Sequence, residues 1–166
     1  MKPAPSSTAP QSITLRPLRF EEIPEVLRLI RRAIDVGCRS IYDADQRGAV
    51  WSGYAQTLFA ESMGPFESVV AETDGNIVGL SQWDAADDRL RALFVDGAVQ
   101  RRGVGWTLLA EVERSARRRG CLRLRGAMSL NAVPFYERAG FRSYGGPVPL
   151  RTFGVAVPII RMEKAL

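Results

Sequence analysis

Apolar residues in the first third of the chain are spaced first as in a strand and then as in a helix. Residues 13–16 are a short strand candidate. Across residues 19–34 the apolar positions recur every three or four residues, which predicts an amphipathic helix, and Gly37 marks its end. Residues 40–62 have no clear period, and we interpret them as a loop with one or two short helices.

Three strand signals follow the chain break at Gly64-Pro65. Residues 68–72 and 76–83 are apolar runs joined by Thr73-Asp74-Gly75, and Asp-Gly between two such runs is a strong hairpin signal. A polar turn then leads into residues 89–95, RLRALFV. The pattern predicts an antiparallel meander of three strands.

The second half of the chain alternates helices with strands. We predict a helix over 104–119 closed by Gly120, a strand over 122–128, a short helix over 131–139 and two further strands, the last near 155–162. The other strand covers 141–144, and a Gly/Pro-rich connection, residues 145–149, follows it. This order predicts an α/β (α+β) fold, with a mixed, mostly antiparallel central sheet of about six to seven strands and helices on both faces.

Length and composition agree with one globular domain. The chain has 166 residues, of which 46% are hydrophobic and 25% charged. Residues 1–12 are rich in Pro, Ser and Ala without an apolar run, so we interpret them as a flexible tail and 13–166 as the domain. No stretch approaches the roughly 20 apolar residues of a membrane span, which predicts a cytoplasmic protein without a membrane partner.

Two residue types limit the chemistry. The chain has two cysteines, Cys38 and Cys121, and no histidine. Two isolated cysteines do not make a disulfide framework, and without histidine the commonest metal ligand and the usual base at neutral pH are missing. We therefore expect no metal site, and we interpret Cys121 as a core residue.

The net charge of +5 is unevenly distributed. Residues 100–142 hold ten arginines and three acidic residues, a formal charge of +7, whereas the rest holds 13 basic and 15 acidic residues, a charge of −2. The run 117–119, RRR, suits a helix C-terminus facing solvent. No nucleic-acid motif or aromatic interleaving accompanies it, so we expect no nucleic-acid partner.

The most informative segment is 93–109, LFVDGAVQRRGVGWTLL. A strand ends at Val95, and a polar loop with Gly103 and Gly105 leads directly into a helix. The first N–H groups of a helix have no partner within it and face outward with the positive end of the dipole, so this arrangement suits an anion. Arg101 and Arg102 add positive charge.

Three other interpretations compete for this loop. A P-loop needs Gly-Lys-Ser/Thr, but Trp106 and Thr107 follow Gly105. A dinucleotide fingerprint needs a third glycine where Leu108 stands, after the first strand of a parallel unit rather than after a meander. In the plainest interpretation the glycines only make a turn, which the adjacent arginines, strand and helix argue against.

Two segments resemble a known family. Residues 100–105, Gln-x-x-Gly-x-Gly, lie between LRALFVDGAV and LLAEVERSARRRG and resemble the acetyl-CoA segment of the GNAT superfamily of N-acetyltransferases. Residues 129–141, SLNAVPFYERAGF, resemble its other cofactor segment. With the meander before them and the strand after them, the match extends to most of the chain.

The resemblance implies where acetyl-CoA binds. The amides of residues 101–105 would hold the pyrophosphate, and strand 93–95 would part from its neighbour and pair with the pantetheine arm. Asn131 would face the pantetheine and Tyr136 the thioester sulfur. The predicted cofactor-binding residues are Leu93, Phe94, Val95, Gln100, Arg101, Arg102, Gly103, Val104, Gly105, Trp106, Asn131 and Tyr136.

Acetyl transfer to an amine needs a neutral amine and a stabilised thiolate. Tyr136 is the candidate general acid for the sulfur, although a packed aromatic beside Phe135 is the alternative interpretation. The family often places a Glu on the strand before the loop, and RLRALFV has no carboxylate there. The candidates for the base are Asp84, Asp87, Asp88, Glu61, Glu72 and a water chain ending on backbone carbonyls.

The resemblance places the acceptor between residues 39–62 and 145–154. Tyr42, Trp51, Tyr54, Trp83 and Phe153 could line an aromatic pocket, with core packing as the alternative for each. We expect a small-molecule amine, and the acidic bias of this half favours a cationic one, such as a polyamine. A protein Lys or N-terminal acetyltransferase and a non-catalytic CoA-binding sensor stay open, and the fold permits homodimers.

Overall fold

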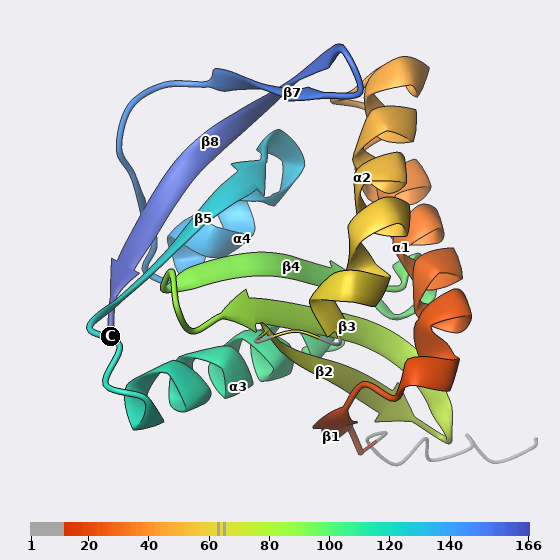
Figure 1. The fold of residues 1–166 in the computed structure, drawn as a ribbon, viewed down its shortest axis with the longest axis vertical. Coiled ribbons are helices and arrows are strands. Elements are labelled where there is room, and N and C mark those ends of the chain that lie inside the picture. The colour runs from red at the N-terminus through yellow and green to blue at the C-terminus, as the bar shows by residue number, and fades with distance from the viewer. Residues whose placement is uncertain (1–11, 63, 65) are drawn as a thin grey trace, which may run out of the picture.

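A mixed sheet runs through the protein (Figure 1). The computed structural model describes residues 12–62, 64 and 66–166, apart from the side chains of 59–62, so the expected tail lies almost wholly outside it. Among these residues eight strands form one sheet, ordered β1-β2-β3-β4-β5-β8-β6, with β7 paired to β8. The strands are β1 Thr14–Pro17, β2 Phe66–Thr73, β3 Asn76–Asp84, β4 Arg89–Val95, β5 Arg123–Ser129, β6 Arg142–Ser143, β7 Val148–Thr152 and β8 Val155–Ala165.

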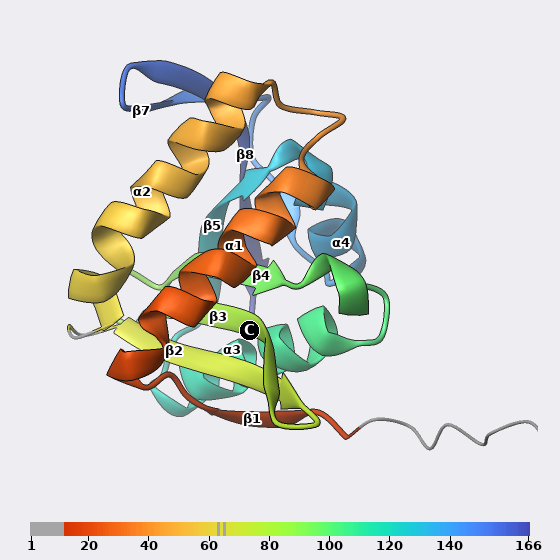
Figure 2. The ribbon, with the colours of Figure 1, turned by 90° about the vertical axis from the view of Figure 1, so that its right-hand side faces the viewer.

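Helices cover both faces of the sheet (Figure 2). The two helices on one face are α1 Ile23–Gly37 and α2 Ala44–Ser62, and their apolar side chains share one core with β2, β3 and β8. On the other face, α3 Val104–Arg118 and α4 Val133–Arg138 share a second core with β4, β5 and β8. Three 3-10 turns are η1 Phe20–Glu22, η2 Gly97–Val99 and η3 Leu130–Ala132. No helix in the described part of the chain is long and apolar enough to cross a membrane.

The expected fold class is confirmed, and the strand pairing follows the predicted order. β2, β3 and β4 pair antiparallel in succession, as the predicted three-strand meander required, and β1 extends it by pairing antiparallel with β2. β4 and β5 pair in parallel, because α3 carries the chain across the sheet between them. The extra strand β7 comes from the Gly/Pro-rich connection, where residues 148–152 fold back on β8.

The segment between α1 and β2 differs from the sequence expectation. Instead of one or two short helices it forms the single 19-residue helix α2. This helix packs on α1 and also meets β7 and β8, and residues 50–55 are all half-buried. Because partners lie on several sides of α2, no single apolar stripe marks it in the sequence.

The position of α3 depends on a close approach at Gly79 of β3. An added Cβ there would lie 2.8 Å from Cδ1 of Leu108 and 3.1 Å from Cγ1 of Val104, both on α3, and 3.1 Å from the carbonyl oxygen of Phe94. Leu108 is fully buried and Val104 nearly so. The lack of a side chain at residue 79 therefore lets the first turns of α3 lie directly on the sheet.

We predict that Gly79→Ala destabilises the protein by about 1–3 kcal/mol, because the extra methyl overpacks the contact between β3 and α3. Urea denaturation of the purified variant measures this change. The matched control is Gly48→Ala in α2, where a Cβ would meet nothing within 4 Å, and it should stabilise by about 0.5–1 kcal/mol. Equal effects of the two variants would contradict the tight packing at Gly79.

Candidate functional site

The sheet opens between β4 and β5. The two strands pair only where Arg89 faces Arg125 and Leu90 faces Gly126. Beyond that point β5 continues along β8 and β4 along β3, and Figure 1 shows the two strands diverging. The edge of β4 that faces β5 is left without a strand partner from Ala92 onward, so its N–H and C=O groups need another one.

A cavity of about 410 Å³ occupies this opening. Its walls come from both halves of the sheet, from α1 and α2 on one side and from η3 and α4 on another. The described lining residues are Ile34, Cys38, Tyr42, Val50, Gly53, Tyr54, Thr57, Arg89, Leu90, Arg91, Ala92, Leu93, Phe94, Ala127, Met128, Ser129, Ala132, Tyr136, Leu150, Thr152, Val157 and Ile159.

A β-bulge shapes the wall that β4 contributes. Gln82 of β3 pairs with Ala92 and Trp83 pairs with Leu90, so Arg91 is an extra residue on β4. Tyr54 of α2 donates a hydrogen bond of 2.9 Å from its hydroxyl to the Arg91 carbonyl oxygen. Tyr54 also packs edge-on against Phe94, at 4.9 Å between ring centroids. Bulges redirect the side chains and backbone groups of a strand, and here α2 holds the bulge in place.

The loop between β4 and α3 is built as an anion cradle. Arg101 and Gly103 both adopt the left-handed conformation, with φ of 67° and 86°. For arginine that conformation is uncommon, and alternation of this kind turns successive N–H groups toward one point. The first bond within α3 runs from Thr107 N–H to the Gly103 carbonyl oxygen, at 3.0 Å. The N–H groups of residues 104–106 therefore have no hydrogen-bond acceptor within the helix.

The two family-like segments meet at the start of α3. A Cβ at Gly105 would lie 3.5 Å from the ring of Phe135 in α4 and 3.7 Å from Cγ2 of Val95. Trp106, which is about half exposed, lies with its ring 5.1 Å from that of Phe135. The end of β4, the loop and α4 thus form one continuous surface.

Gln100 and Asn131 come together at the C-terminal end of α1. Measured from an ideal Cβ on Gly37, the Asn131 amide nitrogen lies at 3.5 Å and that of Gln100 at 3.9 Å. The Cys38 thiol donates to Oδ1 of Asn131, at 3.3 Å. Both amide side chains are on exposed residues, which leaves them accessible beside the cavity.

Tyr136 is buried yet borders the cavity. Its ring packs against Phe135 and Phe141, with centroids 5.1 and 5.3 Å away. Burial, together with the nearby Tyr54 phenol, raises the pKa of Tyr136 above its ordinary value. The phenol therefore keeps its proton at neutral pH and can donate a hydrogen bond, but it does not act as a base.

The other predicted cofactor residues divide between cavity and loop. Leu93 and Phe94 line the cavity. Arg101 and Arg102 are exposed on the loop, Gly103 precedes α3, and Val104 is buried beneath it. The three sequence-predicted groups, strand, loop and α4, are thus brought together along one path.

No carboxylate candidate for the base borders the cavity among the described residues. Asp87 pairs with Arg89 and Arg125, and Asp84 accepts a hydrogen bond from the Ala86 amide. Asp88 lies in the turn before β4, and the side chain of Glu61 lies outside the described part of the chain.

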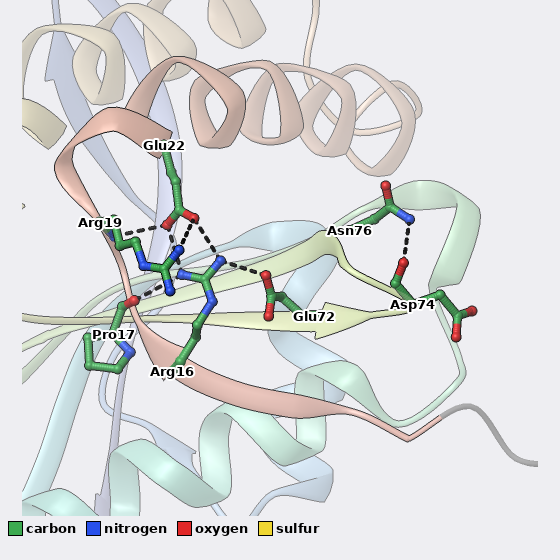
Figure 3. Close-up of polar contacts among 7 residues, drawn as sticks. All are labelled: Arg16, Pro17, Arg19, Glu22, Glu72, Asp74 and Asn76. Atoms are coloured by element: carbon green, nitrogen blue, oxygen red, sulfur yellow. Dashed lines mark hydrogen bonds and ion pairs between the residues drawn. The ribbon is translucent and has the colours of Figure 1, made fainter.

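Glu72 has a structural role at the edge of the sheet. Figure 3 shows the Arg16 guanidinium between the carboxylates of Glu22 and Glu72, at 2.7 and 2.6 Å. The hydrogen bond from Arg16 holds the pKa of Glu72 below its usual range. This ion-pair cluster joins β1, η1 and β2 and leaves Glu72 unsuited to accept a substrate proton.

Of the five aromatic residues expected around the acceptor, Tyr42 and Tyr54 line the cavity and three do not. Trp51 packs against α1 and donates to the Leu27 carbonyl oxygen. Trp83 is buried in the α3-side core and donates to Glu67. Phe153 is exposed in the turn between β7 and β8. Their sequence positions did not reveal which face of the sheet, or which side of a turn, each would occupy.

Tyr42 ties the walls of the cavity together, a role that the sequence did not reveal. Its hydroxyl donates to the Pro158 carbonyl oxygen at 2.6 Å and accepts from the Leu130 amide at 2.9 Å. Through this one group, the segment between α1 and α2 is fixed to β8 and to η3. Burial raises the pKa of the Tyr42 phenol.

The arginine run of residues 117–119 lies at the far end of α3. Since an α-helix rises about 1.5 Å per residue, the run is roughly 20 Å from the anion cradle. Arg117 pairs with Glu113 at 3.4 Å, and Arg119 with Glu67, so the run serves the helix end as the sequence suggested.

Two arginines and one cysteine of the cavity wall were not predicted from the sequence. Arg89, Arg91 and Cys38 all line the cavity. Alternation in the strand RLRALFV was a usable signal, because residues 89 and 91 flank the core residue Leu90. Within the described part of the chain, no cluster of three or more Cys, Asp or Glu side chains is arranged to hold a metal ion.

Comparison with known proteins identifies the family. The model of the acetyltransferase (GNAT) domain matches residues 40–166. No curated protein matches the sequence.

Solved structures share the fold over nearly the whole chain. A GCN5-related N-acetyltransferase from Rhodopseudomonas palustris is 23% identical, with a TM-score of 0.87, covering 97% of this chain and 100% of that one. The PaiA N-acetyltransferase from Thermoplasma acidophilum, in complex with coenzyme A, is 20% identical, with a TM-score of 0.78 and coverage of 93% and 99%. A ribosomal-protein-alanine N-acetyltransferase from Brucella melitensis is 21% identical, with a TM-score of 0.65 and coverage of 92% and 99%.

At these identities the solved structures establish the fold alone, while the family model spans more than half of the chain. The cradle before α3, the open edge of β4 and the cavity between β4 and β5 occur on that same fold. The chain therefore belongs to the GNAT family and is an acetyltransferase.

Proposed function

We propose that this enzyme transfers the acetyl group of acetyl-CoA to a primary amine on a small molecule, by direct attack of the amine. The observation that carries the proposal is the opening of the sheet after Leu90 and Gly126, with Tyr136 bordering the cavity that results. An extended arm that carries a thioester can form hydrogen bonds with the free edge of β4 only where β5 does not occupy that edge. The parting of the strands supplies that space.

The cradle suits the phosphates at the other end of such a molecule. Amides of residues 104–106, the left-handed turns at Arg101 and Gly103 and the positive end of α3 all favour an anion. Gln100 and Asn131 lie between this cradle and the cavity, where amide groups can pair with the pantetheine arm. We assign cofactor binding to these residues together with Leu93, Phe94 and Val95.

Tyr136 is assigned the role of general acid. When the amine nitrogen attacks the carbonyl carbon and the carbon–sulfur bond breaks, the thiolate needs a proton, and the Tyr136 phenol is protonated at neutral pH. The proton that the nitrogen loses balances the one that the sulfur gains. Because no described carboxylate lies on the cavity wall, the proton that the nitrogen loses passes to water held by backbone carbonyls.

Contacts that narrow one side of the cavity support a small acceptor rather than a protein. α2 and the β7–β8 hairpin meet across the cavity: a Cβ on Gly53 would lie 3.5 Å from Cγ2 of Thr152, and Gln46 donates to the Ala156 carbonyl oxygen at 3.0 Å. A protein acetyltransferase needs an open groove for a peptide at this position.

We predict that Gly103→Glu weakens acetyl-CoA binding at least about 100-fold, equivalent to about 2.7 kcal/mol. The carboxylate would repel the phosphates and fill the space beside the amides. Isothermal titration with acetyl-CoA measures it. Gly75→Glu is the matched control, because Gly75 shares the positive φ, at 76° against 86°, and has equally open surroundings in the remote β2–β3 turn. Equal affinities of the two variants would remove the cradle from the cofactor site.

We predict that Tyr136→Phe lowers kcat about 10²- to 10⁴-fold, the usual contribution of a positioned acid, while the acetyl-CoA affinity stays unchanged. Release of free thiol with an amine panel measures turnover. Tyr144→Phe, at an exposed residue after β6, is the control and should keep the wild-type rate. A wild-type rate for Tyr136→Phe would return this residue to a packing role.

The same assays separate the rival functions. Thiol release with peptides and not with small amines would identify a protein acetyltransferase. Binding of acetyl-CoA without thiol release from any amine or peptide would identify a non-catalytic CoA-binding sensor.

A further inference from the structure

The C-terminal half of α1 contacts both segments that are assigned to the cofactor. Arg32 and Val36 of this helix meet η2, at the start of the loop between β4 and α3. Gly37 and Cys38 lie against the second segment, residues 129–141, through Asn131. One helix end therefore relates two segments that are far apart in the sequence.

Contacts with α1 fix the position of Gln100. This residue directly follows η2, which is capped by Asp96, whose Oδ1 accepts from an amide of η2 at 3.1 Å. Arg32 donates to Oδ2 of the same carboxylate through Nε and Nη2, at 3.2 and 2.6 Å. A Cβ on Gly97 would lie 3.3 Å from Cγ1 of Val36, so η2 packs closely on α1. The start of the loop is thus held on this helix, and Gln100 with it.

The Cys38 thiol orients the Asn131 amide. Cys38 is the C-cap residue of α1, and its sulfur donates to Oδ1 of Asn131 at 3.3 Å. Burial raises the pKa of the Cys38 thiol, so the proton needed for this bond stays on sulfur at neutral pH. An amide whose oxygen is held in this way presents its nitrogen on the other side.

Two amide nitrogens approach one point beside Gly37. From an ideal Cβ on Gly37, Nδ2 of Asn131 lies at 3.5 Å and Nε2 of Gln100 at 3.9 Å. Both are NH2 groups, which donate hydrogen bonds and do not accept them. Neither nitrogen donates to another residue in the described part of the chain. These two nitrogens, the donor pair, cannot satisfy each other, whereas one oxygen acceptor between them can satisfy both.

The location of the donor pair favours a carbonyl oxygen of an extended arm. The pair lies between the anion cradle and the cavity, where the pantetheine arm of acetyl-CoA passes in the proposed function. That arm contains secondary amides, and a carbonyl oxygen with its two lone pairs accepts from two donors at once. The donor pair is therefore suited to hold one amide of the arm.

Resting on the proposed function, we infer that Cys38 is a positioning residue for the cofactor. Its thiol holds Oδ1 of Asn131, so that Asn131 and Gln100 donate together to one amide carbonyl oxygen of the pantetheine arm. Cys38 acts through Asn131 and takes no part in the transfer of the acetyl group.

The test removes the thiol donor from the full-length enzyme. Cys38→Ala deletes the donor, whereas Cys38→Ser replaces it with a hydroxyl that also donates. Cys121→Ala is the matched control, because this thiol is equally buried, at 8% against 7% exposed. It also donates to a carbonyl oxygen, that of Arg123 at 2.9 Å, but in the α3-side core. Asn131→Ala and the double variant with Cys38→Ala complete the set.

Isothermal titration compares acetyl-CoA and CoA with 3′-phospho-ADP, the part of CoA that lacks the arm. We expect Cys38→Ala to weaken binding of both arm-containing ligands about three- to tenfold, the effect of losing one hydrogen bond, and to leave 3′-phospho-ADP binding unchanged. Cys38→Ser should restore most of the affinity, and Cys121→Ala should match wild type.

Two further measurements identify how the thiol acts. In the Asn131→Ala background, Cys38→Ala should add no further loss of affinity, because the thiol acts through that amide. At saturating acetyl-CoA, kcat of Cys38→Ala should equal the wild-type value, because the arm is held away from the reacting atoms.

The outcomes separate this inference from the proposed function. Equal acetyl-CoA affinities of Cys38→Ala and Cys121→Ala, an equal loss for 3′-phospho-ADP, or additive losses in the double variant would overturn the inference and leave the cofactor assignment in place. A lower kcat with unchanged CoA affinity would also overturn it, by moving the donor pair to the thioester. Absence of acetyl-CoA binding to wild-type enzyme would overturn the proposed function itself.

Discussion

The interrupted pairing of β4 with β5 is the constraint on which the rest of the site depends. After Leu90 and Gly126 the two strands diverge, and the inner edge of β4 is left with backbone groups that need partners. A sheet normally avoids such an edge. Here the edge forms one wall of a cavity, and hydrogen bonds from two tyrosines fix the other walls around it. The Tyr54 hydroxyl of α2 binds the bulge at Arg91, and the Tyr42 hydroxyl links η3 to β8. A ligand with main-chain-like polar groups can satisfy the edge.

Charged and polar groups are unevenly distributed along this opening. The N-terminal end of α3 collects unpaired amides and the two exposed arginines of the loop. The opposite side of the cavity holds Arg89 and Arg91. Carboxylates that would repel anionic ligands instead form hydrogen bonds and ion pairs within the protein. Glu67, for example, accepts hydrogen bonds from Trp83, Ser115 and Arg119. The loop end of the opening therefore favours negative charge, and the cavity wall beside it is largely apolar.

Much of the fold was predictable because its signals are local. Asp74-Gly75 predicted the β2–β3 hairpin, and the periodic apolar residues of α1 and α3 predicted the bounds of both helices to within a few residues. The glycine pattern at 103 and 105 located the cradle, since a left-handed turn before a helix imposes a local requirement on residue type. α2 escaped prediction because its partners, α1, β7 and β8, lie on several sides and leave no stripe in its sequence.

By itself the sequence determined the order of the elements apart from α2 and β7, the glycine loop before α3 and the presence of Tyr136 in a short helix after β5, because each depends on neighbouring residues. Only the tertiary structure decided which side chains face the cavity. Tyr42 and Tyr54 reach it, whereas Trp51, Trp83 and Phe153 do not, and Glu72 is held at the sheet edge by Arg16 instead. The physical reason is that the cavity wall is assembled from strands and helices far apart in the chain. A one-residue bulge at Arg91, invisible in the sequence, sets which β4 side chains line the cavity.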